Sequence, residues 1–395
     1  MVAVTPENQL ILLLARGSVT PSIEQQAREL LATPLQWQSI LEKVTAEEVY
    51  PLFNRNFSNL DYHSVPNEVR TQLYNLSRIQ ALRSRLMTEE LTRVLGLLAS
   101  AGIATVPLKG VALAEDLYGD PSMRVCVDMD ILVPPQAIRQ TFRFLLMHGY
   151  ASEFPSGFFA DLLLRHDIEY ALRRQDHGIP HLLELHWGIV WGGRAEKTIA
   201  AGMWPDAFPT TVCGAPAYAL PAEWQLLILA THAARHQWQG LKWLVDIHDL
   251  CCSKDIAWEK VRATAEHFGW EELLSITLHI CHTLFETSVP SVFTRDTIPS
   301  WVGFFPASAP DHWSNAFFAT RFLKTPLERL RYVARVLLIP TLAELRTFPL
   351  PSFLGFLYYP LRPLRLACKW SWQFVSAGLQ RRQLPHQNSL NESGK

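Results

Sequence analysis

Two aspartates separated by one residue, Asp128 and Asp130, are the side chains of this sequence best spaced to do chemistry. They open the apolar run DMDILV, whose alternation predicts a strand over residues 125–133. Side chains at i and i+2 of a strand share a face, so their Cα atoms lie about 6.7 Å apart. Parallel carboxylates repel each other unless a cation lies between them. The pair therefore indicates a divalent-cation site, although two aspartates on a solvent-exposed edge strand would have the same pattern.

A third acidic side chain interrupts the apolar segment HLLELHW, in a strand expected over residues 181–190. Alternation places Glu184 and His186 on one face and their leucine and tryptophan neighbours on the other. If this strand lies beside the first, Glu184 completes a group of three carboxylates with Asp128 and Asp130. Two members would hold a metal, and the third would orient or deprotonate an attacking hydroxyl. The alternative is a glutamate paired with an arginine across the sheet.

Basic residues near the acidic strand are suited to phosphate. Lys109-Gly110 lies in a turn between a short β-type run and a helix, where glycine permits close backbone approach and the helix N-terminus offers free N–H groups. Lys109 adds a point charge. Arg124 lies just before the acidic strand and is also expected to reach a phosphate. The alternative is that both cations only balance Glu115 and Asp116. The P-loop pattern GxxxxGK[ST] is not found in the sequence.

Two histidines spaced four apart share one face of a helix expected over residues 222–236. His232 and His236 could form a metal site with Asp246 on the next helix, but the HExxH pattern is missing. The interpretation we favour is that this face packs on the acidic strands and contacts nucleotide or acceptor. His186 is expected to do the same.

The elements that must position these residues fall into four regions. Residues 1–100 have helical periodicity, including one long helix over 71–100, and residues 101–220 alternate strand and helix patterns. Helices return over 221–320, and 321–395 is a basic, proline-interrupted helical tail with a polar end expected to be disordered. The expected fold class is α+β, with a small mixed β-sheet between helical N-terminal and C-terminal additions.

Composition narrows the class of protein. The chain has 395 residues, of which 48% are apolar and 18% charged, with a net charge of −1, which excludes disordered and collagen-like chains. Six cysteines show no CxxC pairing and are interpreted as reduced thiols. No apolar run reaches the roughly 18 residues of a membrane-spanning helix. The apolar run at residues 10–14 is too short for a signal peptide, so we expect a cytoplasmic protein.

The charge is unevenly distributed. Residues 321–382 hold eleven Lys or Arg against two Asp or Glu, interleaved with aromatic residues such as Tyr358, Tyr359, Trp370 and Trp372. Such a segment can be a solvated helical face covering the acidic remainder of the chain. It can also rest peripherally on an anionic inner-membrane surface, with the aromatic rings at the interface. Binding to a nucleic acid such as tRNA is the least favoured of the three interpretations.

The combination LKGxAL…Y…P…R…DxDILV, followed by (D/E)LHW, resembles the uncharacterised bacterial nucleotidyltransferase-like family of the polymerase-β nucleotidyltransferase superfold. The resemblance covers roughly residues 75–255 and continues in the segments ATHAARHQW and LKWLVDI. It implies a short mixed sheet backed by helices. It also implies transfer of a nucleoside monophosphate from a nucleoside triphosphate (NTP) to an acceptor, dependent on Mg²⁺ or Mn²⁺.

At matching positions the resemblance implies Asp128 and Asp130 as metal ligands and Glu184 as the third carboxylate, so all three are expected to be catalytic and to contribute to the metal site. It leaves the acceptor open among small molecules, sugars and proteins. Two departures stand out: Lys109-Gly110 replaces the usual Gly-Ser or Gly-Gly, and Glu184 replaces the more usual aspartate. Two other functions stay open: a non-catalytic nucleotide sensor or scaffold on the same fold, and a DxD glycosyltransferase. The glycosyltransferase would require a longer parallel sheet before the aspartates.

Overall fold

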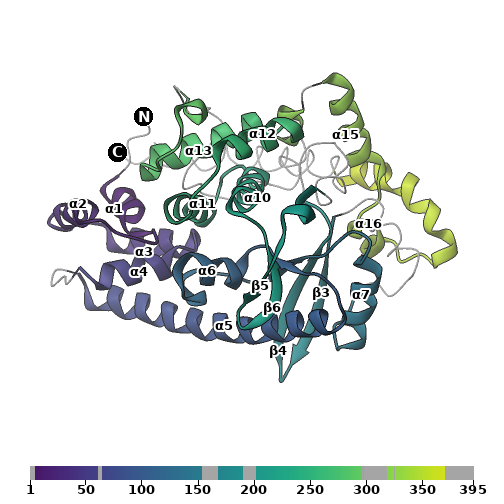
Figure 1. The fold of residues 1–395 in the computed structure, drawn as a ribbon, viewed down its shortest axis with the longest axis horizontal. Helices are drawn as coiled ribbons and strands as arrows, with labels where there is room; N and C mark the ends of the chain where they lie inside the picture. Colours follow the sequence, from purple (N-terminus) through teal and green to yellow (C-terminus); the bar gives the residue numbers. More distant parts are fainter. Residues whose placement is uncertain are drawn as a thin grey trace, which may run out of the picture. The chain divides into compact units, whose positions relative to one another are not determined.

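The structure is a computed structural model that describes residues 5–60, 65–153, 168–189, 202–295, 297, 318–323 and 325–369 (Figure 1). The described residues fall into two compact units. The first lies within residues 1–153 and 168–324, and the second within 325–395. All candidate site residues belong to the first unit.

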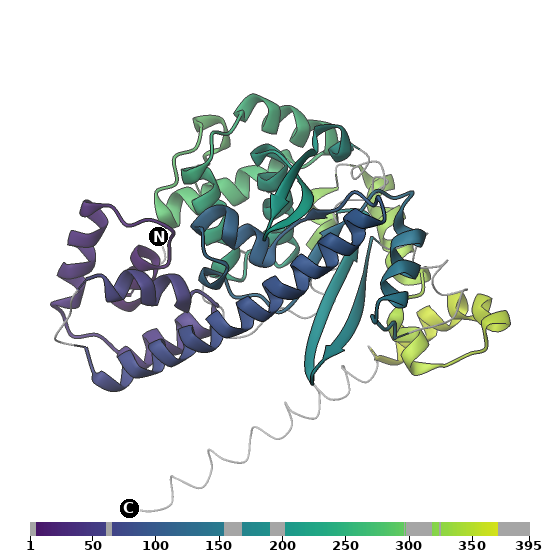
Figure 2. The same cartoon turned by 60° about the horizontal axis from the view of Figure 1, so that its bottom comes forward.

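The described residues within the first hundred are mostly helical, as their periodicity predicts. The helices are α1 (Pro6–Leu14), α2 (Pro21–Leu31), α3 (Trp37–Ala46), α4 (Tyr50–Ser58) and α5 (Asn67–Ser100). Thr5 and Thr20 cap α1 and α2 through their side-chain oxygens, and each is followed by the proline that favours a first helical position. Helix α5 buries Leu73, Leu91 and Leu95 along one stripe. Figures 1 and 2 both show α5 running from the α1–α4 group to the β-strands, so one helix supports both parts.

A four-stranded mixed sheet lies at the centre of the first unit. Its strands are β1 (Val106–Pro107), β2 (Met129–Leu132), β3 (Glu169–Asp176) and β4 (Ile179–His186), in the order β1-β2-β4-β3. Strand β2 pairs in parallel with β4, and the other two pairings are antiparallel. The β3–β4 hairpin turns at His177-Gly178, where both residues have positive φ. The expected small mixed sheet with helical additions is confirmed.

Strand β2 is shorter than the sequence predicts. Only Met129–Leu132 pairs with β4, and Asp128 lies in a bend just before the strand. The preceding segment is held by other contacts: the Arg124 side chain binds Asp246, and Gln80 donates to the Arg124 carbonyl at 2.9 Å. These contacts take the place of the backbone hydrogen bonds to β4 that would have extended the strand. Residue 190, the predicted end of the strand over 181–190, lies outside the described residues.

The other helices of the first unit come from intervening and later parts of the chain. They are α6 (Gly110–Tyr118), α7 (Ile138–Met147), α10 (Ala222–Arg235), α11 (Leu241–Ser253), α12 (Trp258–Phe268) and α13 (Glu271–Phe285), and α6 contacts both β1 and β2. The unit also contains the short 3₁₀ turns η1 (Pro121–Met123), η2 (Trp204–Asp206), η3 (Ser291–Phe293) and η4 (Ala319–Phe322). Helix α10 is buried on nearly every side, because it contacts both α11 and α13.

A separate hairpin, β5 (Phe208–Val212) and β6 (Ala215–Ala219), was not expected from the sequence. Its two-residue turn is Cys213-Gly214, both at positive φ, instead of the Asn-Gly or Asp-Gly that signals such a turn. The Tyr218 N–H donates to the Thr105 carbonyl at 2.8 Å, which ties the hairpin to the segment before β1.

The second unit contains α15 (Pro326–Leu338), α16 (Leu342–Thr347) and η5 (Ser352–Leu357), followed by helical residues 358–369. Thr325 and Thr341 begin α15 and α16 with capping boxes. Arg362 and Arg365 both pair with the buried Glu344, so these two tail arginines have a partner inside the unit. Within the described residues, no helix is both long and apolar enough to cross a bilayer. Trp370, Trp372 and the polar C-terminal end lie outside the described residues.

Candidate functional site

The parallel β2–β4 pairing brings the acidic residues together. Asp130 and Glu184 are direct register partners, and Asp128 comes immediately before β2. Asp128 and Glu184 line a cavity of about 240 Å³ between the sheet and α10. Its other polar lining residues are Lys109, Glu169, His186, Thr231, His232, Arg235 and His236. Glu184 and His186 share the cavity-facing side of β4, as alternation predicts, whereas Asp128 lies in the bend before β2 and only Asp130 belongs to that strand.

His186 is the centre of a chain of charged contacts. Its Nε2 lies 3.0 Å from Asp130 Oδ1 and 3.7 Å from Glu184 Oε2, and its Nδ1 lies 3.4 Å from Glu169 Oε2. Burial opposes the charged imidazole, but hydrogen bonds to Asp130 and Glu184 raise the pKa of His186 to about 9. Burial also opposes ionisation of Asp130, yet Lys109 and His186 hold the pKa of that carboxyl well below its usual value.

Asp128 shows the electrostatic cost of the cluster. Burial, followed by repulsion from Asp130 and Glu184, raises the pKa of Asp128 to about 6. Lys109 and Lys242 act in the opposite direction without cancelling this effect. Carboxylate oxygens are the ligands that hard divalent cations prefer, so the donor set fits Mg²⁺ or Mn²⁺. A bound cation would relieve the repulsion that raises this pKa.

Lys109 lies at the start of α6, where the sequence places a phosphate-binding turn. Its Nζ is 3.1 Å from Asp130 Oδ1 and 3.4 Å from His232 Nδ1. Gly110 has φ +71, and a Cβ there would lie 3.5 Å from the Asp128 carbonyl, so the turn packs directly against the acidic segment. Lys109 does not balance Glu115 or Asp116 in this structure. Glu115 accepts from the Cys213 N–H, and Asp116 pairs with Lys254.

His232 of α10 and His236, which directly follows this helix, both line the cavity, as their spacing of four predicts. Burial is the main cause that lowers the pKa of both imidazoles, to about 4 for His236, so both are neutral at pH 7. The His236 ring stacks on Trp243 of α11 with centroids 4.3 Å apart. Neutral imidazoles can both donate and accept hydrogen bonds, which suits contacts with a nucleotide.

Arg124 does not line the cavity, contrary to the sequence-based expectation. Its guanidinium is buried against Asp246 of α11, with Nε 3.0 Å from each carboxylate oxygen and Nη2 2.9 Å from Oδ2. The Arg124 side chain is 7% exposed and the Asp246 side chain 2%. The same ion pair engages the carboxylate that a His232–His236–Asp246 metal site would have used. Within the part of the chain that the structure describes, the three-ligand group is Asp130, Glu184 and His186.

Sequence reasoning missed Glu169 and Arg235. Glu169 opposes His186 in the β3–β4 register, and Arg235 of α10 pairs with it at 3.1 Å. The hairpin turn at His177-Gly178 fixes this register, so pairing the residues outward from the turn would have placed Glu169 beside His186. The pairing of Arg235 with Glu169 can be recognised only once the packing of α10 on the sheet is known.

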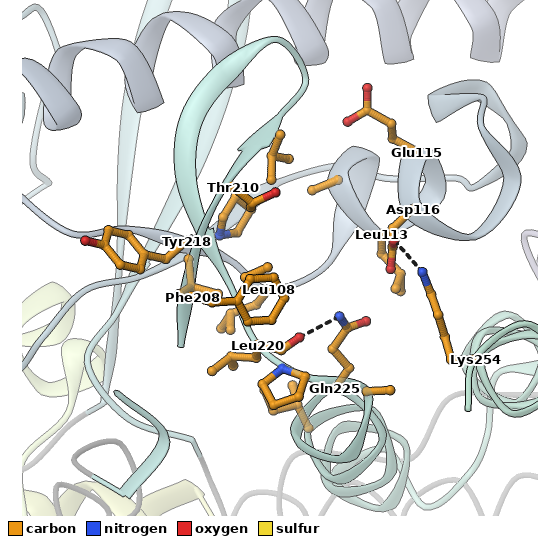
Figure 3. A pocket seen from close by; sticks show the side chains of 18 of the residues that line it. Leu108, Leu113, Glu115, Asp116, Phe208, Thr210, Tyr218, Leu220, Gln225 and Lys254 are labelled. Atoms are coloured by element: carbon orange, nitrogen blue, oxygen red, sulfur yellow. Dashed lines mark hydrogen bonds and ion pairs between the residues drawn. The ribbon is translucent and has the colours of Figure 1, made fainter. Parts of the chain in front are cut away.

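A second cavity of about 500 Å³ lies between α6, the β5–β6 hairpin and α10 (Figure 3). It shares Leu108 and Ile228 with the first cavity. Apolar side chains, including Phe208 and Leu220, make up most of its lining. Polar groups lie at its edges: Gln225, which donates to the Leu220 carbonyl at 2.9 Å, and the Lys254–Asp116 pair at 2.6 Å. Its size is in the range of small-molecule sites.

A comparison with known families agrees with this geometry. A family model described as an uncharacterised nucleotidyltransferase matches residues 33–286, which include all the strands and helices of the site. Searches of curated proteins and of solved structures find no match. Because the family match covers more than half of the chain, this protein belongs to the uncharacterised nucleotidyltransferase family.

Proposed function

We propose that the protein is a metal-dependent nucleotidyltransferase that moves a nucleoside monophosphate from an NTP to an acceptor hydroxyl. The observation that carries this proposal is that Asp128 and Glu184 line one cavity with Lys109, while Asp130, the register partner of Glu184, contacts Lys109 and His186 of the same lining. Family membership supports the transferase class. Mg²⁺ or Mn²⁺, the NTP and the residue roles below are our assignments.

In this proposal each residue has a defined task. Asp128 and Asp130 hold the divalent cation, which when bound neutralises triphosphate charge and polarises the α-phosphoryl group. Lys109 and the backbone at Gly110 bind phosphate oxygens at the α6 N-terminus. Glu184 contributes one carboxylate oxygen to the same cation, and its other oxygen orients the acceptor hydroxyl and accepts its proton. The acceptor oxygen forms a bond to the α-phosphorus, the bond from that phosphorus to the bridging oxygen breaks, and pyrophosphate leaves.

The α10 residues complete the nucleotide site. His232 and His236 face the same cavity as the carboxylates, and both are neutral. They are therefore suited to hydrogen bonds with the nucleotide that do not change the charge of the site. We assign Arg124 no nucleotide contact, because Asp246 already takes its charge.

The second cavity is the place we propose for the acceptor. It adjoins the carboxylate cavity across Leu108 and Ile228, and its lining fits a small molecule with an apolar body and polar edge groups. Filling it with a Thr210→Trp substitution should abolish label transfer from an α-labelled NTP to compounds in a metabolite extract. Cation-dependent NTP binding should persist. Pro209→Trp, on the same strand but outside the cavity lining, is the matched control.

The main rival is a nucleotide sensor without turnover. Purified protein with Mg²⁺ and each NTP is assayed for pyrophosphate release, beside Asp130→Asn. Release that depends on Asp130 supports the enzyme. Cation-dependent nucleotide binding without release, in the presence of a metabolite extract, would instead establish the sensor.

A specific observation favours a second role for the second unit. Leu330, Phe353 and Phe356 are large apolar side chains 61–78% exposed on a segment rich in arginine. We propose that this unit rests on anionic lipid, with apolar side chains in the interface and arginines at the headgroups. The full chain should bind phosphatidylglycerol-containing vesicles at low salt and release them at high salt. Equally strong binding to neutral vesicles, or no binding to either kind of vesicle, would refute this role.

A further inference from the structure

We propose that His186 releases its Nε2 proton to solvent and binds the divalent cation directly through that nitrogen, together with Asp130 and Glu184, and that the site therefore prefers Mn²⁺ to Mg²⁺. This inference rests on the proposed function but goes beyond it, because the carboxylates alone do not distinguish the two cations. It also assigns Glu169 as a positioning residue for the imidazole.

The first argument is the spacing of the donor atoms. Cis ligands of an octahedral cation at about 2.1 Å lie about 3.0 Å apart, and trans ligands about 4.2 Å apart. His186 Nε2 lies 3.0 Å from Asp130 Oδ1 and 3.7 Å from Glu184 Oε2. One ligand atom from each of Asp130, Glu184 and His186 lies within 4.8 Å of the other two. One cation can therefore contact the three atoms with only small side-chain adjustments.

The second argument is the orientation of the ring. His186 Nδ1 faces Glu169 Oε2 at 3.4 Å, which leaves Nε2 directed at the two acidic residues. Arg235 fixes Glu169 in turn, with its Nη2 3.1 Å from Glu169 Oε1. A carboxylate on one imidazole nitrogen and a cation on the other is the usual arrangement of metal-bound histidine. A histidine that served only as a counter-charge for Asp130 would not need this second carboxylate.

The third argument is the position of His186 in the fold. The imidazole is only 7% exposed, and β4 holds it in register opposite Leu132 on one side and Glu169 on the other. The ring cannot rotate into solvent without breaking its contacts with Asp130, Glu184 and Glu169. Imidazole nitrogen suits transition metals, whereas Mg²⁺ takes oxygen ligands almost exclusively. A rigid imidazole nitrogen at this site therefore favours Mn²⁺ over Mg²⁺.

The direct test is electron spin-echo spectroscopy of the full chain loaded with Mn²⁺ alone. A directly bound imidazole gives nitrogen modulation, and selective ¹⁵N labelling of histidine should change it without altering the protein. His186→Gln should remove the modulation and most of the preference for Mn²⁺. His181→Gln, on the same strand but outside the cavity lining, should leave both unchanged.

Glu169→Gln tests the positioning role. It should keep the nitrogen modulation while lowering Mn²⁺ affinity about 10–100-fold, the usual effect of losing such a partner. Mn²⁺ bound without histidine modulation in the wild-type chain would overturn this inference and leave the carboxylate site intact. Failure of the wild-type chain to bind either Mn²⁺ or Mg²⁺, with or without an NTP, would instead overturn the proposed function.

Discussion

The buried ion pair between Arg124 and Asp246 should be worth several kcal/mol when one partner is removed. The two side chains are 7% and 2% exposed and make three N–O contacts of 2.9–3.0 Å. Asp246→Asn keeps the volume but leaves the guanidinium buried without a counter-charge. Breaking such a pair costs about 3–5 kcal/mol, which is a factor of at least 100 in the unfolding equilibrium.

The double variant separates charge from packing. Arg124→Met with Asp246→Leu replaces both charges by apolar groups and should unfold within about 1 kcal/mol of the wild type, because neither charge is then left unpaired. Urea unfolding of the first unit, followed by tryptophan fluorescence, measures both variants. A single-variant loss below about 1 kcal/mol would refute the reasoning, since it would mean that the arginine had found water or another partner.

The same double variant decides the role of Arg124. If the ion pair only supports the segment ahead of Asp128, cation-dependent NTP affinity should change less than about threefold. A tenfold loss of NTP affinity with unchanged Mn²⁺ affinity and unchanged stability would show that Arg124 contacts phosphate. The sequence-based expectation would then be right and our assignment wrong.

Two further predictions concern the fold around the site. Burial raises the pKa of Asp249 from 3.8 to about 6, so this group stabilises the fold below about pH 4 and loses that contribution as the pH rises through 6. Asp249→Asn should remove this fall, so the stability of the variant relative to the wild type should rise by about 2–3 kcal/mol between pH 4 and pH 7 in urea titrations. A stability difference that does not change with pH would contradict the prediction. Gly110→Ala should destabilise the fold by about 1–2 kcal/mol and weaken NTP binding, because Gly110 has a φ of +71. The control Gly96→Ala, inside α5 with open space around it, should stabilise the fold by about 0.5–1 kcal/mol. Equal effects of the two substitutions in thermal unfolding would exclude strain at Gly110.

Alternation along single strands explains what the sequence could predict at the site. It placed Glu184 and His186 on one face of their strand before any partner strand was known. Whether that strand lies beside Asp130 depends on the parallel β2–β4 pairing, which crosses more than fifty residues. No local pattern specifies such a pairing; the family resemblance pointed to it.

Long-range partners account for the differences. Arg124 is four residues from Asp128, and this closeness suggested a shared phosphate site, but its charge partner lies 122 residues further along the chain. Glu169 and Arg235 joined the site through a hairpin register and a helix docking that sequence reasoning did not combine. The β5–β6 hairpin escaped prediction because tertiary contact, and not a favoured turn sequence, supports its Cys213-Gly214 turn.

The central claim is that the β2–β4 carboxylates hold a divalent cation that carries a triphosphate. Calorimetric titration of a non-hydrolysable NTP, with and without Mn²⁺ or Mg²⁺, tests it most directly on the wild type, Asp130→Asn and the half-exposed control Asp176→Asn. The account predicts cation-dependent binding in the wild type and the control, weakened at least 100-fold in Asp130→Asn. Binding that needs no cation, or that Asp130→Asn leaves unchanged, would contradict it.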